Sequence, residues 1–137
     1  MDDERVLDRA YQDAVYEVDL PEGSVAFRIG DAPPRGLPLP LALVTACNPG
    51  MERPGEAAHR AANRRLETEL VRRGFRFFHG RGRDQAATHV EPSFAVIGMS
   101  RDDALALAAA SGQAAIVYAG ADRIELLWCT PPHLPSA

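Results

Sequence analysis

The sequence contains no lysine, so all 15 of its basic residues are arginine. This absence excludes chemistry that needs a lysine amine, such as Schiff-base formation or the phosphate-binding lysine of a P-loop. The two cysteines are too few for a disulfide framework. No apolar stretch approaches the length of a membrane span, and the acidic start has no signal-like apolar segment. We therefore expect a cytoplasmic protein with reduced thiols and no membrane partner.

What is present is typical of a globular domain. The chain has 137 residues, of which 46% are hydrophobic and 25% are charged, and its formal net charge is -4. This length suffices for one buried core. A negative net charge gives no general attraction to nucleic acid, which we do not expect as a partner. We predict a single α+β domain over residues 1–130 and a loose proline-rich tail over residues 131–137.

Helical and strand patterns alternate along the chain. Apolar residues at helical spacing predict helices over residues 3–12, 55–73 and 100–111. Short β-prone runs predict strands over residues 14–20, 24–30, 41–46, 75–79, 93–99, 114–118 and 124–129. The first helix should bury a narrow stripe of Val6, Leu7, Ala10 and Tyr11. The segment 80–84, Gly-Arg-Gly-Arg-Asp, is predicted to be a flexible basic loop.

The order of these elements indicates a topology. The first two strands form a hairpin around Pro21-Glu22-Gly23, and the order that follows is strand-helix-strand-strand-helix-strand with one further strand. This is the split β-α-β pattern of a ferredoxin-like antiparallel sheet, with two helices on one face and the N-terminal hairpin added. Strands 41–46 and 93–99 are apolar on both faces, so we expect them to be adjacent and antiparallel at the sheet centre.

In this topology several polar segments meet at one end of the sheet. Two strands, 41–46 and 75–79, end there, and the strands 93–99 and 114–118 begin there. The long helix also begins there, and the free N–H groups of its first turn favour an anion. The candidate ligand-binding residues collected at this end are Thr45, Asn48, Arg81, Arg83, Ser93 and Gln113, with Glu91 as the candidate catalytic residue. The pattern predicts a site for a small polar or anionic molecule.

Each of these residues has a structural alternative. Glu91 could act as a general base or bind a hydroxyl, amine or guanidinium group, and it could equally pair with an internal arginine or with helix N–H groups. Asn48 could contact a ligand or cap a turn. Arg81 and Arg83 could hold an anion or lie in a solvated loop.

Metal and nucleophile motifs are incomplete. The pair His89-x-Glu91 matches the first half of a zinc deaminase signature, but the second half, Pro-Cys-x-x-Cys, is absent. The remaining potential ligands, Cys47, His79, Cys129 and His133, lack a defined metal spacing. No Gly-x-Ser-x-Gly motif occurs, and a pairing of Cys47 with His89 is not specific. We predict no metal site and no cofactor.

The same segments carry a family resemblance. Thr-Ala-x-Asn-Pro from Thr45, an Asn-bearing helix with Asn63, a Gly-x-Gly segment, Glu-x-Ser-Phe-x-Val-x-Gly from Glu91 and Gly-Gln-x-Ala from Gly112 occur in this order. Together with the run Phe-Arg-Ile-Gly at 27–30, they make residues 11–128 similar to the bacterial DUF3293 family. The resemblance implies a bacterial single-domain protein and adds Asn63 to the ligand-binding candidates, but implies no activity. In the family, an aromatic residue is expected at the position of Cys47. If this position shapes a pocket, the pocket of this chain would be smaller or differently polar.

Three function classes follow from these patterns. The first is a domain that binds a small polar or anionic ligand, with Glu91 as a general base if a reaction follows. The second is a protein-interaction or regulatory module whose polar cluster is structural. The third is an RNA-binding module that uses its arginine loops, although exposed aromatic residues on the central strands are scarce.

Overall fold

The computed structural model describes residues 2–46 and 56–129, which form three helices and seven strands. Their bounds, in chain order, are α1 (Asp2–Asp13), β1 (Val15–Leu20), β2 (Gly23–Phe27), β3 (Leu41–Val44), α2 (Glu56–Arg72), β4 (Arg76–Arg83), β5 (Val90–Ile97), α3 (Arg101–Ala110), β6 (Ala115–Ala119) and β7 (Ile124–Trp128). The expected tail over residues 131–137 lies outside the described residues. None of the helices described combines the length and hydropathy needed to cross a bilayer.

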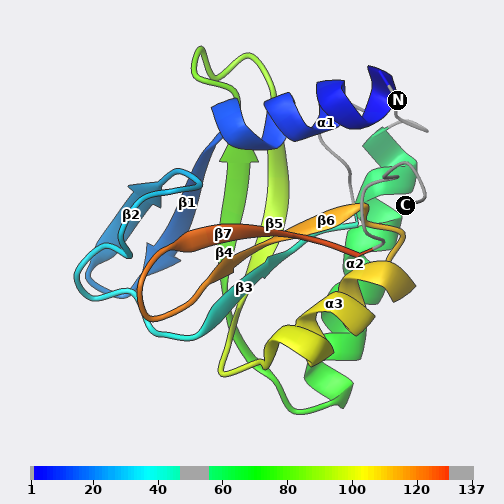
Figure 1. The fold of residues 1–137 in the computed structure, drawn as a ribbon. Coiled ribbons are helices and arrows are strands. Elements are labelled where there is room, and N and C mark those ends of the chain that lie inside the picture. The colour runs from blue at the N-terminus through cyan, green and yellow to red at the C-terminus, as the bar shows by residue number, and fades with distance from the viewer. Residues whose placement is uncertain (1, 47–55, 130–137) are drawn as a thin grey trace, which may run out of the picture.

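The strands form one curled antiparallel sheet in the order β2-β1-β4-β5-β3-β6-β7 (Figure 1). Strands β3 and β5 lie at its centre and pair antiparallel, with Leu43 opposite Ala95. The N-terminal hairpin of β1 and β2 extends the sheet by pairing β1 with β4. The predicted α+β class, the hairpin and the central pairing of residues 41–46 with 93–99 are confirmed. The pairing follows from strands that are apolar on both faces and therefore bury both.

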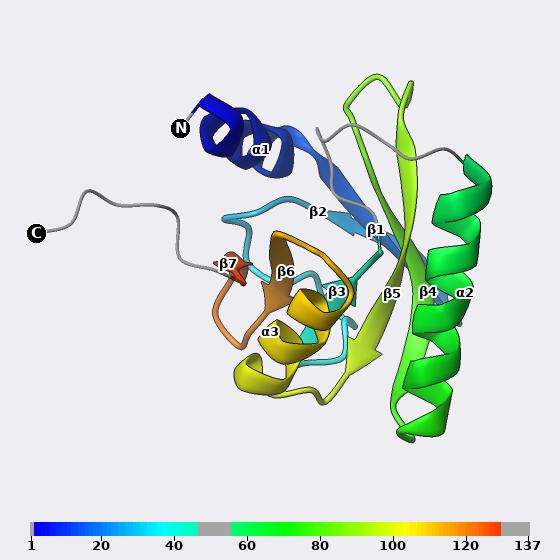
Figure 2. The ribbon, with the colours of Figure 1, turned by 90° about the vertical axis from the view of Figure 1, so that its right-hand side faces the viewer.

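The two faces of the central strands belong to different hydrophobic clusters. Ala42 and Val44 of β3 pack on the side that carries α2 and α3, together with Leu66 and Leu107 of those helices. Figure 2 shows α1 on the opposite side of the β4–β5 pair from α2. Leu43 points to that opposite side and packs in the cluster that contains the buried residues of α1. The sheet is thus covered on both faces, and α1 closes the face on which the candidate site lies.

Helix α1 buries a slightly different stripe from the one predicted. Leu7 and Tyr11 are buried as expected, whereas Val6 is 57% exposed. The stripe continues instead at Ala14, directly after the helix, because steps of four and three residues keep one helix face toward the sheet. The Tyr16 hydroxyl donates to the Tyr11 carbonyl oxygen at 2.8 Å, and this bond ties the helix to β1.

The prediction of a flexible loop at residues 80–84 is wrong, because residues 80–83 are the end of β4. A Cβ atom at Gly80 would lie 2.6 Å from the Glu17 carbonyl oxygen of β1, and one at Gly82 would lie 3.2 Å from the Tyr16 ring. The two glycines therefore allow β1 to pack closely against β4 rather than providing flexibility. The reversal follows β4, where the Asp84 carboxylate accepts the His89 backbone N–H at 3.1 Å.

Candidate functional site

A cavity of about 550 Å³, here called the α1 cavity, lies between α1 and the sheet. Five of the candidate residues line it, from four different segments of the chain: Thr45, Arg83, Glu91, Ser93 and Gln113. The other lining residues are Ala10, Tyr11, Asp13, Ala14, Tyr16, Leu43, Gly82, Asp84, Gln85, His89 and Val117. The volume is within the range of small-molecule sites. The structure thus brings these five residues, from distant segments of the chain, to the wall of one cavity.

Strand β5 presents Glu91 and Ser93 to this cavity. Alternate residues of a strand share a face, so these two side chains lie on the same side of the sheet. Across the ladder, Glu91 faces Gly82 and Ser93 faces Gly80, the two glycines against which β1 packs closely. Glu91 is only 7% exposed and is the single charged residue that is buried in the part of the chain described. A buried carboxylate thus lies in the wall of the α1 cavity.

The Ser93 hydroxyl is the unusual polar group of the site. Its oxygen is buried and has no hydrogen-bond partner among the described residues. A buried hydroxyl without a partner destabilises a fold by about 1–3 kcal/mol, and buried polar side chains are therefore nearly always bonded. An exception of this kind, in the wall of a cavity, needs a reason outside the stability of the fold.

Gln113 and Thr45 are joined by a hydrogen bond at the end of β3. The Thr45 backbone N–H donates to the Gln113 side-chain oxygen at 3.0 Å, and the Thr45 hydroxyl donates to the Pro92 carbonyl oxygen at 2.8 Å. Strand β6 begins at Ala115, so the Gln113 amide takes the place of a backbone carbonyl beyond the end of the ladder. Both residues are buried. Their positions support the wall of the α1 cavity.

Asn63 also binds the backbone at the end of β3, but from the other face of the sheet. Its side-chain oxygen accepts the Ala46 backbone N–H at 3.0 Å. Asn63 belongs to α2 and lines a separate groove of about 410 Å³ between α2 and strands β4 and β5, not the α1 cavity. The structure therefore separates Asn63 from Glu91, although it brings both close to the end of β3.

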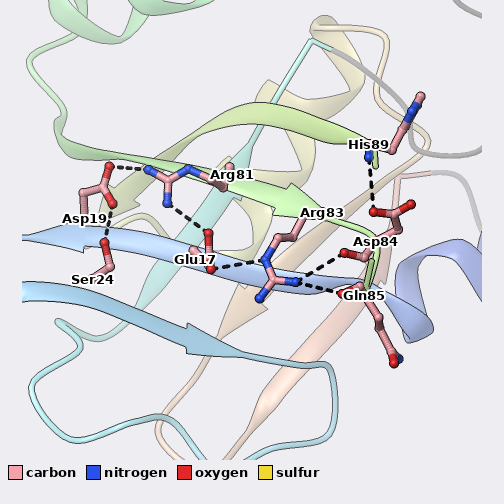
Figure 3. A network of polar contacts seen from close by, with 8 residues as sticks. All are labelled: Glu17, Asp19, Ser24, Arg81, Arg83, Asp84, Gln85 and His89. Atoms are coloured by element: carbon pink, nitrogen blue, oxygen red, sulfur yellow. Dashed lines mark hydrogen bonds and ion pairs between the residues drawn. The ribbon is translucent and has the colours of Figure 1, made fainter. Parts of the chain in front are cut away.

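Arg81 and Arg83 are engaged with acidic residues of β1 (Figure 3). Arg81 donates to Glu17 at 3.1 Å and also pairs with Asp19. Arg83 donates from Nε to Glu17 at 3.2 Å and from its terminal nitrogen to the carbonyl oxygens of residues 84 and 85. Arg81 does not line the α1 cavity, whereas Arg83 does. The two guanidinium groups thus neutralise β1 carboxylates.

The pairing shifts the pKa values of Glu17, Asp19 and Arg81. Hydrogen bonds from Arg81 and Arg83 hold the pKa of Glu17 below its usual range, against a smaller opposing effect of burial. The hydroxyl of Ser24, and then Arg81, lower the pKa of Asp19 in the same way. The carboxylates in turn raise the pKa of Arg81. The network is therefore fully ionised at neutral pH.

Two tyrosines that were not among the sequence candidates line the cavity. Burial raises the pKa of Tyr11 and Tyr16 well above the usual value, and the nearby Glu91 charge raises both further. Both phenols therefore stay neutral. The Tyr11 hydroxyl donates to the Ala115 carbonyl oxygen at 3.1 Å, which anchors α1 over the cavity. The apolar periodicity placed Tyr11 on the buried face of the helix predicted over residues 3–12, but it did not place that face over the site.

The remaining candidates fall elsewhere. Asn48, Cys47 and His133 lie outside the described residues. Cys129 packs against the cluster beneath α2 and α3, and burial raises the pKa of its thiol. Within residues 2–46 and 56–129, no group of three or more His, Cys, Asp or Glu side chains is placed to hold a metal ion.

Comparison with known proteins gives one result. Neither curated proteins nor solved structures provide a match to this chain. The model of the family described as "Protein of unknown function (DUF3293)" matches residues 44–116. The matched region runs from the end of β3 to the start of β6 and includes Thr45, Glu91, Ser93 and Gln113. The chain belongs to the DUF3293 family.

Proposed function

We propose that this protein binds a small polar molecule in the α1 cavity and that Glu91 and Ser93 provide its polar contacts. The observation that carries the proposal is the buried Ser93 hydroxyl, which has no partner in the part of the chain that the structure describes and lies in the wall of a cavity of about 550 Å³. A ligand that bonds to such a group recovers a hydrogen bond that the free protein lacks. The neighbouring Glu91 carboxylate is buried on the same strand face.

Glu91 is also the group for chemistry if a reaction follows binding. A carboxylate in a cavity can take a proton from a bound hydroxyl or amine, provided that the proton lies within hydrogen-bond reach. Tyr11 and Gln113 are already bonded to backbone groups, so we assign them the role of holding α1 and β3 in place. We assign the proposed catalytic role to Glu91 because its buried side chain lines the cavity, and we assign positioning roles to the two neighbours.

The proposal is tested with amide NMR spectra of the full chain during titration with a fragment library of mixed charge. We expect bound fragments to shift the amide signals of Thr45, Arg83 and Gln113, which line the cavity. The change Glu91→Gln should abolish these shifts with little effect on the melting temperature. Glu22→Gln, at an exposed turn, removes the same charge elsewhere and should leave them intact.

Two results would contradict the proposal. One is that no fragment of any charge shifts the cavity signals. The other is that Glu91→Gln lowers the melting temperature clearly while fragments still bind, which would make the buried carboxylate a structural partner. In either case an interaction or regulatory module with a structural polar cluster becomes the better interpretation.

We also propose the finer fold class and the location of the protein. The strand order β4-β5-β3-β6, with α2 and α3 packed on one face, supports a ferredoxin-like core extended by the N-terminal hairpin. A bacterial cytoplasmic protein is consistent with Cys129, which has no disulfide partner among the described residues.

A further inference from the structure

Two aromatic rings line the α1 cavity from different elements. Tyr11 lines it from α1, and Tyr16 lines it from β1. Each ring is held by a second ring: Tyr11 meets Trp128 edge-on at 6.3 Å between ring centroids, and Tyr16 stacks on Phe27 at 6.3 Å. Both hydroxyl groups already donate to backbone carbonyl oxygens. The two tyrosines therefore offer a ligand fixed ring surface rather than a hydroxyl proton.

Aliphatic side chains complete this part of the wall. Leu43 and Val117 line the cavity from β3 and β6. Leu43 lies close to Ser93, because a Cβ atom at Gly80 would be 3.4 Å from the Leu43 Cδ2 atom and 3.5 Å from the Ser93 Oγ atom. The hydroxyl that has no partner among the described residues is thus set beside apolar surface. A ligand that reaches it needs one polar group on an otherwise apolar body.

The charged residues of the described lining have other partners or face water. Arg83 donates from Nε to Glu17 and from a terminal nitrogen to two carbonyl oxygens of the β4–β5 turn (Figure 3). Glu91 already interacts with another group of the protein, so it needs no countercharge from a ligand. The remaining acidic and imidazole groups of the lining are exposed, and they are those of Asp13, Asp84 and His89. A charged ligand would therefore give up its hydration without gaining a matching countercharge.

We propose that the ligand of the α1 cavity is an uncharged aromatic molecule that carries one hydroxyl or amide group. This inference rests on the proposed function and adds the chemical class of the ligand. The polar group would bond to the Ser93 hydroxyl, which can both donate and accept. A carboxylate accepts up to about four hydrogen bonds, so Glu91 can accept one from the same group beside its existing interaction. The ring of the ligand would pack against Tyr11 and Tyr16.

The test compares five molecules that share a two-carbon chain on a six-membered ring. The reference is 2-phenylethanol. Ethylbenzene lacks its hydroxyl group, 2-cyclohexylethanol lacks its aromatic ring, and phenethylamine and phenylacetate carry a positive and a negative charge. Each is titrated into the full wild-type chain at pH 7 and followed by the amide signals of residues that line the cavity, such as Thr45 and Gln113.

We expect 2-phenylethanol to bind most tightly of the five. Its advantage over ethylbenzene should be roughly tenfold, since its hydroxyl supplies the hydrogen bond that the Ser93 oxygen lacks. Its advantage over 2-cyclohexylethanol should be roughly fivefold, which is about the effect of one favourable pair of aromatic rings. Both comparison molecules are more apolar than the reference, so apolar burial alone predicts the opposite order.

Variants identify the groups responsible. Ser93→Ala should reduce the advantage of 2-phenylethanol over ethylbenzene to about twofold or less. Ser24→Ala is the matched control, since the exposed Ser24 hydroxyl donates to Asp19 outside the cavity, and it should leave this advantage intact. Tyr16→Leu should abolish the preference for the aromatic ring, and Tyr16→Phe, which keeps the ring, should preserve it. The wild-type comparison needs no variant, so the inference remains falsifiable if Tyr16→Leu does not fold.

The outcomes separate the inference from the proposed function. If ethylbenzene, the cyclohexyl alcohol or either charged molecule binds in the cavity as tightly as 2-phenylethanol, the inference fails and ligand binding stands. If the advantage of the hydroxyl group survives in Ser93→Ala protein, the inference also fails. If none of the five molecules, and no fragment of the mixed library, shifts the cavity signals, both the inference and the proposed function fail.

Discussion

Replacing Ser93 by alanine should stabilise the free protein and weaken the binding of a polar molecule in the α1 cavity. The change removes one buried oxygen that has no partner among residues 2–46 and 56–129, and removing such an oxygen from burial stabilises a fold by about 1–3 kcal/mol. Against this, the lost atom forfeits a few van der Waals contacts of about 0.1–0.2 kcal/mol each. The net expectation is a free energy of unfolding that rises by about 1 kcal/mol, with a melting temperature about 3–5 °C higher.

The assay is urea unfolding of the wild type and of Ser93→Ala, compared with Ser100→Ala. Ser100 provides the matched control because its hydroxyl accepts the Asp103 backbone N–H at 3.1 Å as the N-cap of α3. The same chemical change there should lower the free energy of unfolding by about 1 kcal/mol. A rise in the free energy of unfolding for Ser93→Ala together with a fall for Ser100→Ala would support the reasoning. If Ser93→Ala destabilises the protein as much as Ser100→Ala, the Ser93 hydroxyl has a partner in the free protein, such as a bound water, and the reasoning is refuted.

Three further substitutions test the fold around the site. Gly80→Ala should lower the free energy of unfolding by about 2 kcal/mol or more, since its Cβ would lie 2.6 Å from the Glu17 carbonyl oxygen; urea unfolding measures this. Gln113→Leu should cost about 1–3 kcal/mol by leaving the Thr45 N–H without its acceptor, and the amide of Thr45 should lose protection from hydrogen exchange. Arg81→Met should lower stability at pH 7, with the difference from wild type shrinking as the pH falls from about 5 to about 2 in acid titration.

The sign of the last prediction follows from the depressed pKa of Glu17. A carboxyl group whose pKa is lower in the folded protein stabilises the fold above its unfolded pKa, and this contribution is lost as the pH falls through the folded pKa. Removing Arg81 takes away the main cause of the shift, so lowering the pH should reduce the free energy of unfolding of the variant less than that of the wild type. A stability difference that stays constant with pH would contradict this assignment.

The control for Gly80→Ala is Gly120→Ala, where the atom nearest to the added Cβ would be at 3.6 Å, and this change should have a small effect on the free energy of unfolding.

The sequence predicted the centre of the fold because its strongest signal lies there. Residues 41–46 and 93–99 are apolar on both faces, and only a central position buries both faces. The sequence candidates also include every buried polar or charged residue in the described part of the chain. These residues are Thr45, Asn63, Glu91, Ser93 and Gln113. Polar residues next to strand ends stand out in sequence, since few other positions place a polar group beside the core.

The arrangement around these residues could not be predicted in the same way. The Gly-x-Gly segment has the composition of a loop, and only the close approach of β1 requires glycine there. The partners of Arg81 lie more than sixty residues away in sequence, so charge pairing with β1 has no local signal. The position of α1 over the cavity depends on packing of Tyr11 against the sheet, which a periodicity of apolar residues does not specify.

The hydrogen bonds at the end of β3 have a consequence for how the family can vary. Thr45 and Ala46 are held by the side chains of Gln113 and Asn63, which belong to other parts of the chain. The point at which the chain leaves the sheet is therefore held by side chains of α2 and of the segment before β6. A segment inserted or exchanged after Ala46 starts from an anchored point, so its length and sequence can change while the sheet keeps its register. This position is suited to grafting new binding loops beside the α1 cavity.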